Sequence, residues 1–315
     1  MFQLFKDRNF SDFINDTFQF FKMYGKHYFK NYFVINGGLL LLATVLIYFF
    51  MKVYMEFIFS SISGSAGNQV NYMKDFFNAN FGLMIAIIIG AIVLLMIISL
   101  LQFTFPVVYL DLLDSKKGTD FNTKDIVNAM KKRSLKIIKF VLGSVFILFP
   151  LLIIVFGLLI LLCFIIIGIP LLFVMIPAIV SFIHLTFFYY MNSEESFLKA
   201  ISDSFDTLKQ QFWPIIGSTT VILIILQIVS TVFTMIPYVF GMASMLTTLQ
   251  NGAKEDAFSV ISVMMSIIVV VSTIVSYILN NLLLINQGII YYSHIENSDS
   301  PSSNDFIEMI GVESE

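Results

Sequence analysis

Charged residues are scarce in this chain. Asp, Glu, Lys and Arg make up 12% of its 315 residues, whereas a soluble globular domain carries about 25%. A large core cannot account for this deficit, because the surface of a water-soluble protein still needs charge. Together with a hydrophobic share of 58%, the deficit indicates an integral membrane protein.

Cysteine and histidine are also few, and the motifs of soluble enzymes are absent. The one cysteine, Cys163, cannot form a disulfide within the chain. The three histidines, His27, His184 and His294, lie in different segments. The sequence contains no HExxH, no glycine-rich phosphate loop and no GxSxG. We therefore expect no metal, no cofactor and no enzymatic activity, and the net charge of −3 gives no case for nucleic acid.

What the chain does have is five long runs without any charged residue. About 20 apolar residues cross the hydrocarbon as a helix. The 54-residue run at 140–193 is long enough for two crossings, and the other runs fit one each. We place the tight turn between these two crossings at Gly168-Ile169-Pro170. The six expected crossings are 33–55, 81–106, 138–161, 168–190, 213–238 and 259–288.

The basic residues predict the orientation. If the crossings alternate, 15 of the 18 Lys and Arg residues fall on one side, and Lys52, Lys74 and Lys254 fall on the other. Lys and Arg accumulate on the cytoplasmic side of membrane proteins, so both termini are expected in the cytoplasm. The basic residues are 16 Lys and 2 Arg, a composition typical of an AT-rich bacterial genome, which predicts a bacterial inner membrane.

Three amphipathic segments precede the odd-numbered crossings, with apolar residues spaced three and four apart. We expect interfacial helices at 10–30, 123–136 and 194–210. The even-numbered crossings end alike in tyrosine, which favours an interfacial aromatic belt. The fold class predicted is all-α integral membrane, built as three repeats of an interfacial helix plus a transmembrane hairpin. The alternative is that any helix leading into a membrane looks amphipathic. The tyrosines are Tyr109, Tyr189, Tyr190, Tyr291 and Tyr292.

Polar residues inside the crossings are candidates for a functional site, because they are costly in lipid and usually face a bundle interior. A stripe in the last crossing is either a helix-packing seam or a solute pathway. A polar group also precedes each tyrosine ending, and together these could line one inward-facing vestibule. The candidate intramembrane residues are Gln102, His184, Asn280, Asn286 and Gln287, and the stripe also holds Ser262, Ser266, Thr273 and Ser276.

His184 is the one histidine within an expected crossing, so it is the candidate proton-responsive group there. The alternative is a buried imidazole that simply bonds a neighbouring carbonyl. Beyond the last crossing, residues 297–315 form an acidic tail whose composition stays flexible. An apolar patch in this tail is either incidental or a peptide that docks on a partner or on the basic second loop. The patch consists of Phe306, Ile307, Met309 and Ile310.

The stretch from Phe197 to Gly217, FLKAISDSFDTLKQQFWPIIG, is followed by a long apolar crossing. It resembles uncharacterised bacterial six-helix membrane families related to the membrane domain of glycerophosphodiester phosphodiesterases. These families share the amphipathic helix, an aromatic near Trp213 and repeated hairpins. This chain has no soluble phosphodiesterase domain, so the resemblance implies an inner-membrane protein that acts with others, and not the enzymatic activity.

These patterns favour a non-enzymatic scaffold or accessory subunit of a membrane complex. It would contact the lipid bilayer and bind a protein partner through the tail or the interfacial helices. The alternative is a small-solute transporter or channel that uses the polar stripe of the last crossing. The sequence leaves the oligomeric state, the partner and any solute open.

Overall fold

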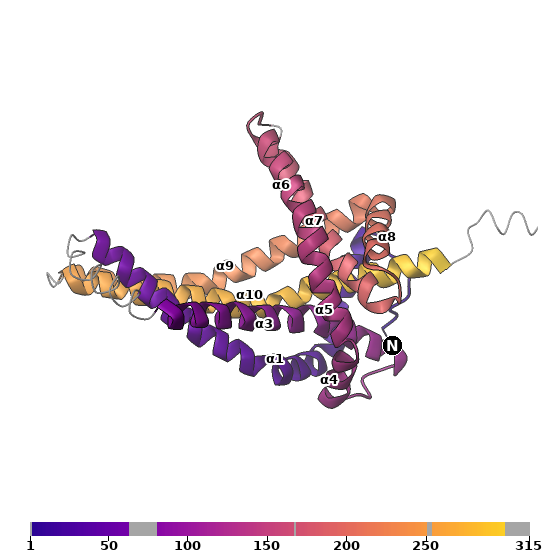
Figure 1. Ribbon diagram of the computed structural model, residues 1–315, viewed down its shortest axis with the longest axis horizontal. Coiled ribbons are helices and arrows are strands. Elements are labelled where there is room, and N and C mark those ends of the chain that lie inside the picture. The colour runs from indigo at the N-terminus through magenta and orange to yellow at the C-terminus, as the bar shows by residue number, and fades with distance from the viewer. Residues whose placement is uncertain (1, 63–80, 167, 251–253, 300–315) are drawn as a thin grey trace, which may run out of the picture. The chain divides into compact units, whose positions relative to one another are not determined.

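The computed structural model describes residues 2–62, 81–166, 168–250 and 254–299 (Figure 1). These residues are helical almost throughout, and no strand occurs among them. Six helices are long and apolar enough to cross a membrane, which confirms the prediction of an all-helical chain with six candidate crossings. They cover Phe10–Met55, Phe81–Ser115, Ser134–Cys163, Gly168–Asn192, Phe212–Thr248 and Val260–Asn297.

The first two elements expected at 10–30 and 33–55 form one continuous helix, α1 (Phe10–Ile62). Its start is fixed by Asn9, whose side chain accepts hydrogen bonds from the backbone N–H groups of Ser11 and Asp12 at 2.9 and 3.1 Å. Such a cap satisfies amide groups that the first turn leaves without a partner. No proline interrupts the helix between its amphipathic and apolar parts, so the backbone continues unbroken.

The other two amphipathic segments are separate short helices. At the start of α4 (Thr123–Lys132), the Asn122 side chain accepts from the Asp125 backbone N–H, and the Asp125 side chain accepts from the Asn122 backbone N–H. This pair of bonds is a capping box. In α8 (Phe197–Gln210), the Ser196 hydroxyl accepts from the Lys199 N–H at 3.3 Å. Each helix ends at a residue with non-helical backbone angles, Arg133 and Gln211. The crossings begin directly afterwards, with α5 (Ser134–Gly143) and α9 (Phe212–Gln250).

The crossing that begins with α5 continues into α6 (Phe149–Cys163), and the remaining crossings are α3 (Phe81–Ser115), α7 (Gly168–Asn192) and α10 (Lys254–Asp299). A π-helical segment, η1 (Ser144–Leu148), joins α5 to α6. Within it the Phe149 N–H bonds to the Ser144 carbonyl, five residues earlier. Pro150 follows immediately and has no N–H to donate. The π-helical turn therefore lies where the α-helical series of backbone hydrogen bonds is already interrupted.

The turn of the long hairpin lies before the predicted Gly168-Ile169-Pro170, which instead begins α7. Two backbone hydrogen bonds, from Ile165 to Leu162 and from Ile166 to Cys163, close the turn at 3.2 and 3.0 Å. Ile166 has a φ of 66°, which is unusual for a β-branched residue. Sequence patterns assign turns to glycine and proline, and here the turn is made by apolar residues.

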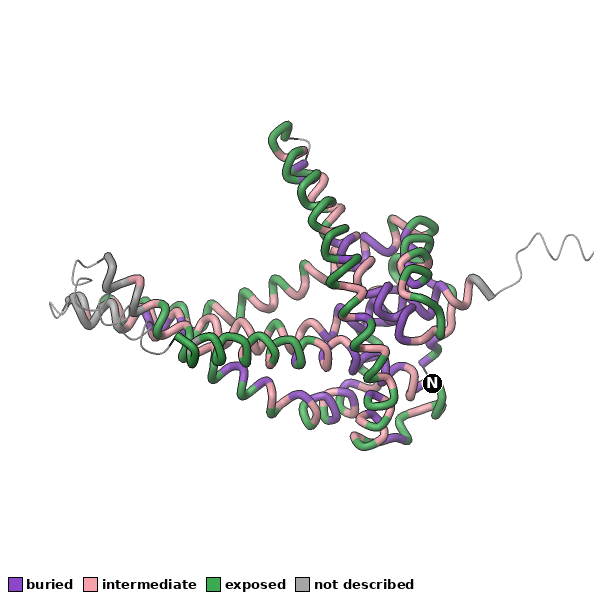
Figure 2. The backbone as a smooth tube through the Cα atoms, in the orientation of Figure 1, coloured by how far each residue is buried: buried purple, intermediate pink, exposed green. Residues whose placement is uncertain are grey.

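The chain divides into two compact units. Unit 1 comprises Met1–Asn31, Phe103–Leu223 and Leu282–Glu315, and unit 2 comprises Tyr32–Gln102 and Ile224–Asn281. Unit 1 has an aromatic core in which Phe20 lies edge-on to Tyr28 and Tyr109, with ring centroids 5.8 and 6.0 Å apart. In Figure 2 most of the buried positions belong to unit 1, whereas α6 and the first half of α3 are largely exposed.

The tyrosine endings of the even-numbered crossings do not form an exposed belt. All five are at most 8% exposed, and they pack inside unit 1. Tyr189 and Tyr291, for example, meet edge-on with ring centroids 4.9 Å apart. The prediction of an interfacial aromatic belt was therefore wrong, because position in the sequence does not distinguish a tyrosine that faces the membrane interface from one that faces protein.

Gly168→Ala should destabilise the hairpin. A Cβ at Gly168 would lie 2.3 Å from the Cys163 backbone nitrogen and 2.6 Å from the Leu162 carbonyl carbon, and backbone atoms cannot turn aside as a side chain can. A Cβ at Gly157, in the same hairpin, would meet nothing within 4 Å. We expect Gly168→Ala to lower the melting temperature of the detergent-solubilised protein and Gly157→Ala to leave it unchanged or raised. Equal melting temperatures would contradict this account of the turn.

Candidate functional site

A hydrogen-bonded network of buried polar side chains links four helices of unit 1. The Ser181 hydroxyl of α7 lies 2.8 Å from that of Thr219 in α9, and Thr219 accepts from the Gln287 amide of α10 at 2.9 Å. Asn286 donates to Thr17 and to the Phe13 carbonyl of α1 at 3.1 and 3.2 Å. The Gln287 amide also reaches Asn286 at 3.3 Å. The five polar side chains of this network, which we call the polar seam, are completely buried; they are Thr17, Ser181, Thr219, Asn286 and Gln287.

Local sequence explains why the seam can form. Thr17 also donates to the Phe13 carbonyl, one turn earlier in α1, at 2.6 Å. Gly288 follows directly after Gln287, and a Cβ there would lie 2.4 Å from Leu110 and 2.9 Å from Phe188. The missing side chain lets α10 approach α3 and α7 closely at the level of the seam. Small residues commonly permit this kind of approach between membrane helices.

His184 lies one turn after Ser181 on α7. Its Nδ1 is 2.6 Å from the Val180 carbonyl, and its ring stacks on Phe103 with centroids 5.1 Å apart. Because Nδ1 meets a carbonyl, it carries the proton in the neutral ring, and Nε2 is left as an acceptor. No described residue bonds to Nε2. The Oε1 of Gln287 and the Oγ1 of Thr104 are likewise buried without a partner among the described residues.

Gln102 and Asn280 belong to unit 2, not to the polar seam. Gln102 of α3 donates to the Tyr277 carbonyl of α10 at 3.1 Å. The same carbonyl accepts from the Tyr32 hydroxyl of α1 at 3.3 Å and from Asn281 at 3.2 Å. The Tyr277 hydroxyl in turn donates to the Ile98 carbonyl at 2.9 Å. Three helices of unit 2 are thus joined at one backbone carbonyl.

The candidate residues differ in their surroundings within each unit. The structure brings Asn286 and Gln287 together and places His184 beside their network. Asn280 is half-buried, and the residue that bonds at this level is its neighbour Asn281. The stripe of the last crossing is also mixed, because Ser262 and Ser266 are buried whereas Ser276 is exposed. The tail residues Phe306, Ile307, Met309 and Ile310 lie outside the described residues.

Sequence reasoning missed residues 2–9, which we call the N-terminal strap. Its anchor is Arg8, which is 3% exposed. The guanidinium bonds to Asp16 of α1 at 2.7 Å and to the Leu4 carbonyl at 2.6 Å, and it also donates to the carbonyls of Gln3 and Lys6. Phe5 of the strap meets Tyr292 of α10 edge-on, with ring centroids 5.0 Å apart. The strap therefore ties the start of α1 to the end of α10.

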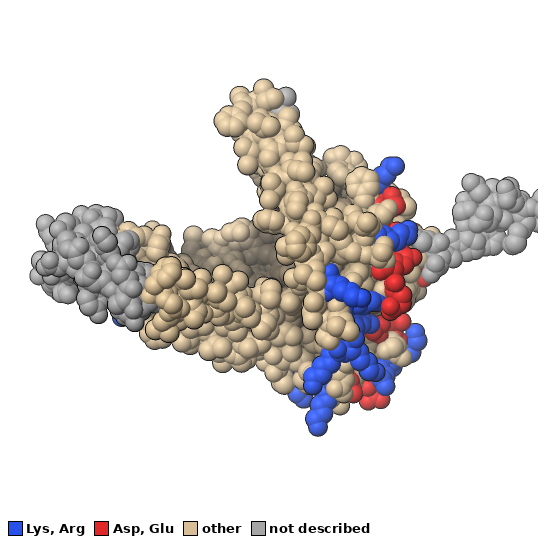
Figure 3. Space-filling view, viewed as in Figure 1, with Lys and Arg blue, Asp and Glu red and all other residues tan. Residues whose placement is uncertain are grey.

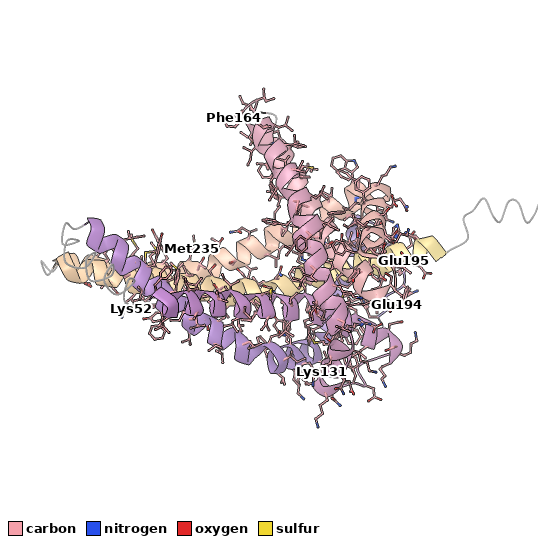
Figure 4. All side chains as sticks on the ribbon, viewed as in Figure 1. Lys52, Lys131, Phe164, Glu194, Glu195 and Met235 are labelled. Atoms are coloured by element: carbon pink, nitrogen blue, oxygen red, sulfur yellow. The ribbon has the colours of Figure 1, made fainter. Side chains whose placement is uncertain are left out.

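The charges of unit 1 gather over α4, α8 and the segments beside them, and α6 shows none (Figure 3). The inner faces of α4 and α8 are buried, with Ile126 and Met130 in α4 and Ala200 and Leu208 in α8. Lys131 extends outward from α4, while Glu194 and Glu195 lie beside the start of α8 (Figure 4). An ion pair joins the segments beside these helices, Lys136 of α5 to Glu194 before α8, at 2.9 Å.

Comparisons with protein families, with curated proteins and with solved structures give no match to this chain. Among the residues that the structure describes, no group of three or more His, Cys, Asp or Glu side chains could hold a metal ion.

The bond between Thr219 and Gln287 should appear as a coupling free energy in a double-mutant cycle. We expect Thr219→Val and Gln287→Leu each to destabilise the protein and the double variant to lose less than the sum. Couplings between polar side chains of membrane helices average about 0.6 kcal/mol and reach about 1.7 kcal/mol. The measurement is reversible unfolding in detergent micelles. Strictly additive losses would show that the two side chains do not interact.

Arg8→Met should release the N-terminal strap. Each hydrogen bond of a charged group contributes about 1.5–3 kcal/mol, and the Arg8 side chain makes four. The matched control is Lys6→Met, since Lys6 is 41% exposed and its nearest carboxylate contact is 3.6 Å; such surface pairs contribute about 0–1 kcal/mol. Limited proteolysis with mass spectrometry of N-terminal fragments should show early cleavage in Arg8→Met alone. Equal protection of both variants would rule out the anchoring role.

Proposed function

We propose that this chain is a non-enzymatic, multi-pass membrane protein that serves as a scaffold or accessory subunit and binds its partner through α8. The observation that carries the proposal is the use of the buried polar groups. The polar seam and the hydrogen bonds to the Tyr277 carbonyl join helix to helix, which is what a structural core requires. In a solute pathway such groups would instead face a cavity.

The outer face of α8 suits a protein partner better than anionic lipid. Leu198 and Phe205, seven residues apart on one face, are 63% and 60% exposed. Acidic side chains flank them, because Glu194, Glu195 and Asp206 are exposed. Carboxylates repel anionic headgroups, whereas an exposed apolar pair with a charged rim is typical of protein interfaces. The partner would therefore present apolar side chains surrounded by basic ones.

The proposal includes the finer organisation that the sequence predicts. The chain would lie in a bacterial inner membrane with both termini in the cytoplasm, because 15 of 18 basic residues fall on that side. In that orientation α4 and α8 face the cytoplasm. Three repeats of interfacial helix plus hairpin would build the chain, and the similar placement of α4 and α8 directly before crossings supports this.

A small-solute transporter is the second candidate. The observation that favours it is the set of buried acceptor atoms without a partner among the described residues, Gln287 Oε1, Thr104 Oγ1 and His184 Nε2. Buried polar atoms are normally satisfied, so water or a solute with hydrogen-bond donors could complete them. Solute uptake by proteoliposomes that contain the purified chain would favour transport over the scaffold.

Purification from the native membrane tests the scaffold directly. We expect a second protein at a fixed ratio to the wild-type chain. The double variant Leu198→Ser/Phe205→Ser should retain it at least about tenfold more weakly, since truncating central interface residues commonly costs more than 1 kcal/mol. The matched control is Phe18→Ser/Met23→Ser on α1, which removes side chains that are 43% and 44% exposed. No protein at a fixed ratio with the wild type, or equal loss in both variants, would refute the proposal.

A further inference from the structure

We propose that the surface formed by the end of α4 and by α5 binds the headgroups of anionic phospholipids. Its members are three exposed lysines and three exposed apolar residues, and we call it the basic rim. The residues of the basic rim are Lys131, Lys132, Leu135, Ile138, Lys139 and Leu142.

The basic rim combines charge with apolar surface in the way a membrane interface requires. Leu135, Ile138 and Leu142 are 71%, 55% and 53% exposed. Leu135, Lys139 and Leu142 recur at spacings of four and three, so they share one face of α5. A face of this kind in water would be unfavourable. At the boundary of a bilayer, the leucines enter the hydrocarbon while the lysine ammonium groups extend to the phosphates.

The depth of the lysines fits the headgroup layer. Lys139 is the last charged residue before the 54-residue run without charge, 140–193. Lys131 and Lys132 lie at the end of α4, and the break in the helix at Arg133 separates them from Lys139 in α5. All three lysines therefore come before the run that enters the hydrocarbon, which is where the headgroup layer lies.

The lysines of the basic rim are available for a ligand. Two basic neighbours on the same elements are occupied, because Arg133 pairs with Asp111 at 2.7 Å and Lys136 pairs with Glu194 at 2.9 Å. Those bonds also neutralise the carboxylates of Asp111 and Glu194. Lys131, Lys132 and Lys139 make no ion pair with any residue in the described part of the chain. A surface with three uncompensated positive charges beside exposed leucines is complementary to phosphatidylglycerol or cardiolipin.

The test compares lipid retention by the full-length protein in detergent, with phosphatidylglycerol and phosphatidylcholine titrated and bound lipid counted by native mass spectrometry. We expect preferential binding of phosphatidylglycerol, which weakens at high salt because the charges are screened. The triple variant Lys131→Gln/Lys132→Gln/Lys139→Gln should bind phosphatidylglycerol roughly 100-fold more weakly, from the summed contribution of three lysines near an anionic surface.

The matched control removes the same charge elsewhere. In Lys116→Gln/Lys117→Gln/Lys199→Gln, two of the lysines are already paired, Lys117 with Asp114 at 3.2 Å and Lys199 with Asp203 at 2.6 Å, and binding should persist. Replacement of the three rim lysines by arginine should also preserve binding, which separates lost charge from misfolding. Equal binding by the wild type and the glutamine variant, or equal loss in the control, would overturn the proposal.

A further measurement distinguishes a lipid headgroup from a free phosphate ion as the ligand of the basic rim. Inorganic phosphate should not displace phosphatidylglycerol, because the leucines of the rim contribute contacts to lipid that a free ion lacks. Displacement by phosphate at low concentration would overturn the assignment to a lipid. The result is independent of the scaffold proposal, which depends on α8 and on a co-purified protein rather than on the lipid.

Discussion

Hydrocarbon offers no donor or acceptor to a polar group, so each polar side chain placed in the membrane must find its partner within the protein. The organisation of both units follows from this constraint. In unit 1 the polar seam connects α1, α7, α9 and α10. In unit 2 the Tyr277 carbonyl collects donors from α1, α3 and α10. Apolar side chains cannot direct helix association in lipid, because lipid is equally apolar. In this protein a few hydrogen bonds direct it.

The sequence predicts the crossings because their cause is local. A run without charge, such as 140–193, is unfavourable anywhere except in lipid, and its length sets the number of helices. The sequence does not predict which side of each helix meets protein. Asn280 and Asn281 are equally polar, yet Asn281 is completely buried and Asn280 only half-buried, because the rotation of α10 decides which side chain meets protein. The tyrosine endings were misplaced for the same reason.

Residues 2–9 show a different limit. In the sequence, Arg8 resembles an ordinary charged residue near the start of a crossing. In the structure, its hydrogen-bond acceptors are mostly backbone carbonyls of the strap itself. Carbonyl groups carry no sequence signature, so a buried arginine held by them is invisible until the chain is folded. The sequence gives one unusual feature of Arg8, which is that the chain contains only two arginines. Arginine suits such a site because its planar fork can reach several acceptors at once.

The two short amphipathic helices differ in what they can hold at the membrane surface. Both bury an apolar face against unit 1, and both begin with a side-chain cap. The outward face of α8 is acidic around Phe205, whereas the segment from Lys131 to Lys139 is basic. Two helices of the same kind therefore present surfaces of opposite charge, and the ion pair between Lys136 and Glu194 lies between them.

The contact between Asn286 and Phe13 joins residues 273 positions apart in the chain. At the usual speed of protein synthesis, about 5–20 residues per second, the α10 side of this contact is made between about 14 and 55 seconds after the α1 side. Throughout that interval α1 is in the membrane without the amide that completes its polar seam. Unit 1 therefore closes only after α10 has been synthesised, and until then α1 lacks the hydrogen bonds that Asn286 supplies.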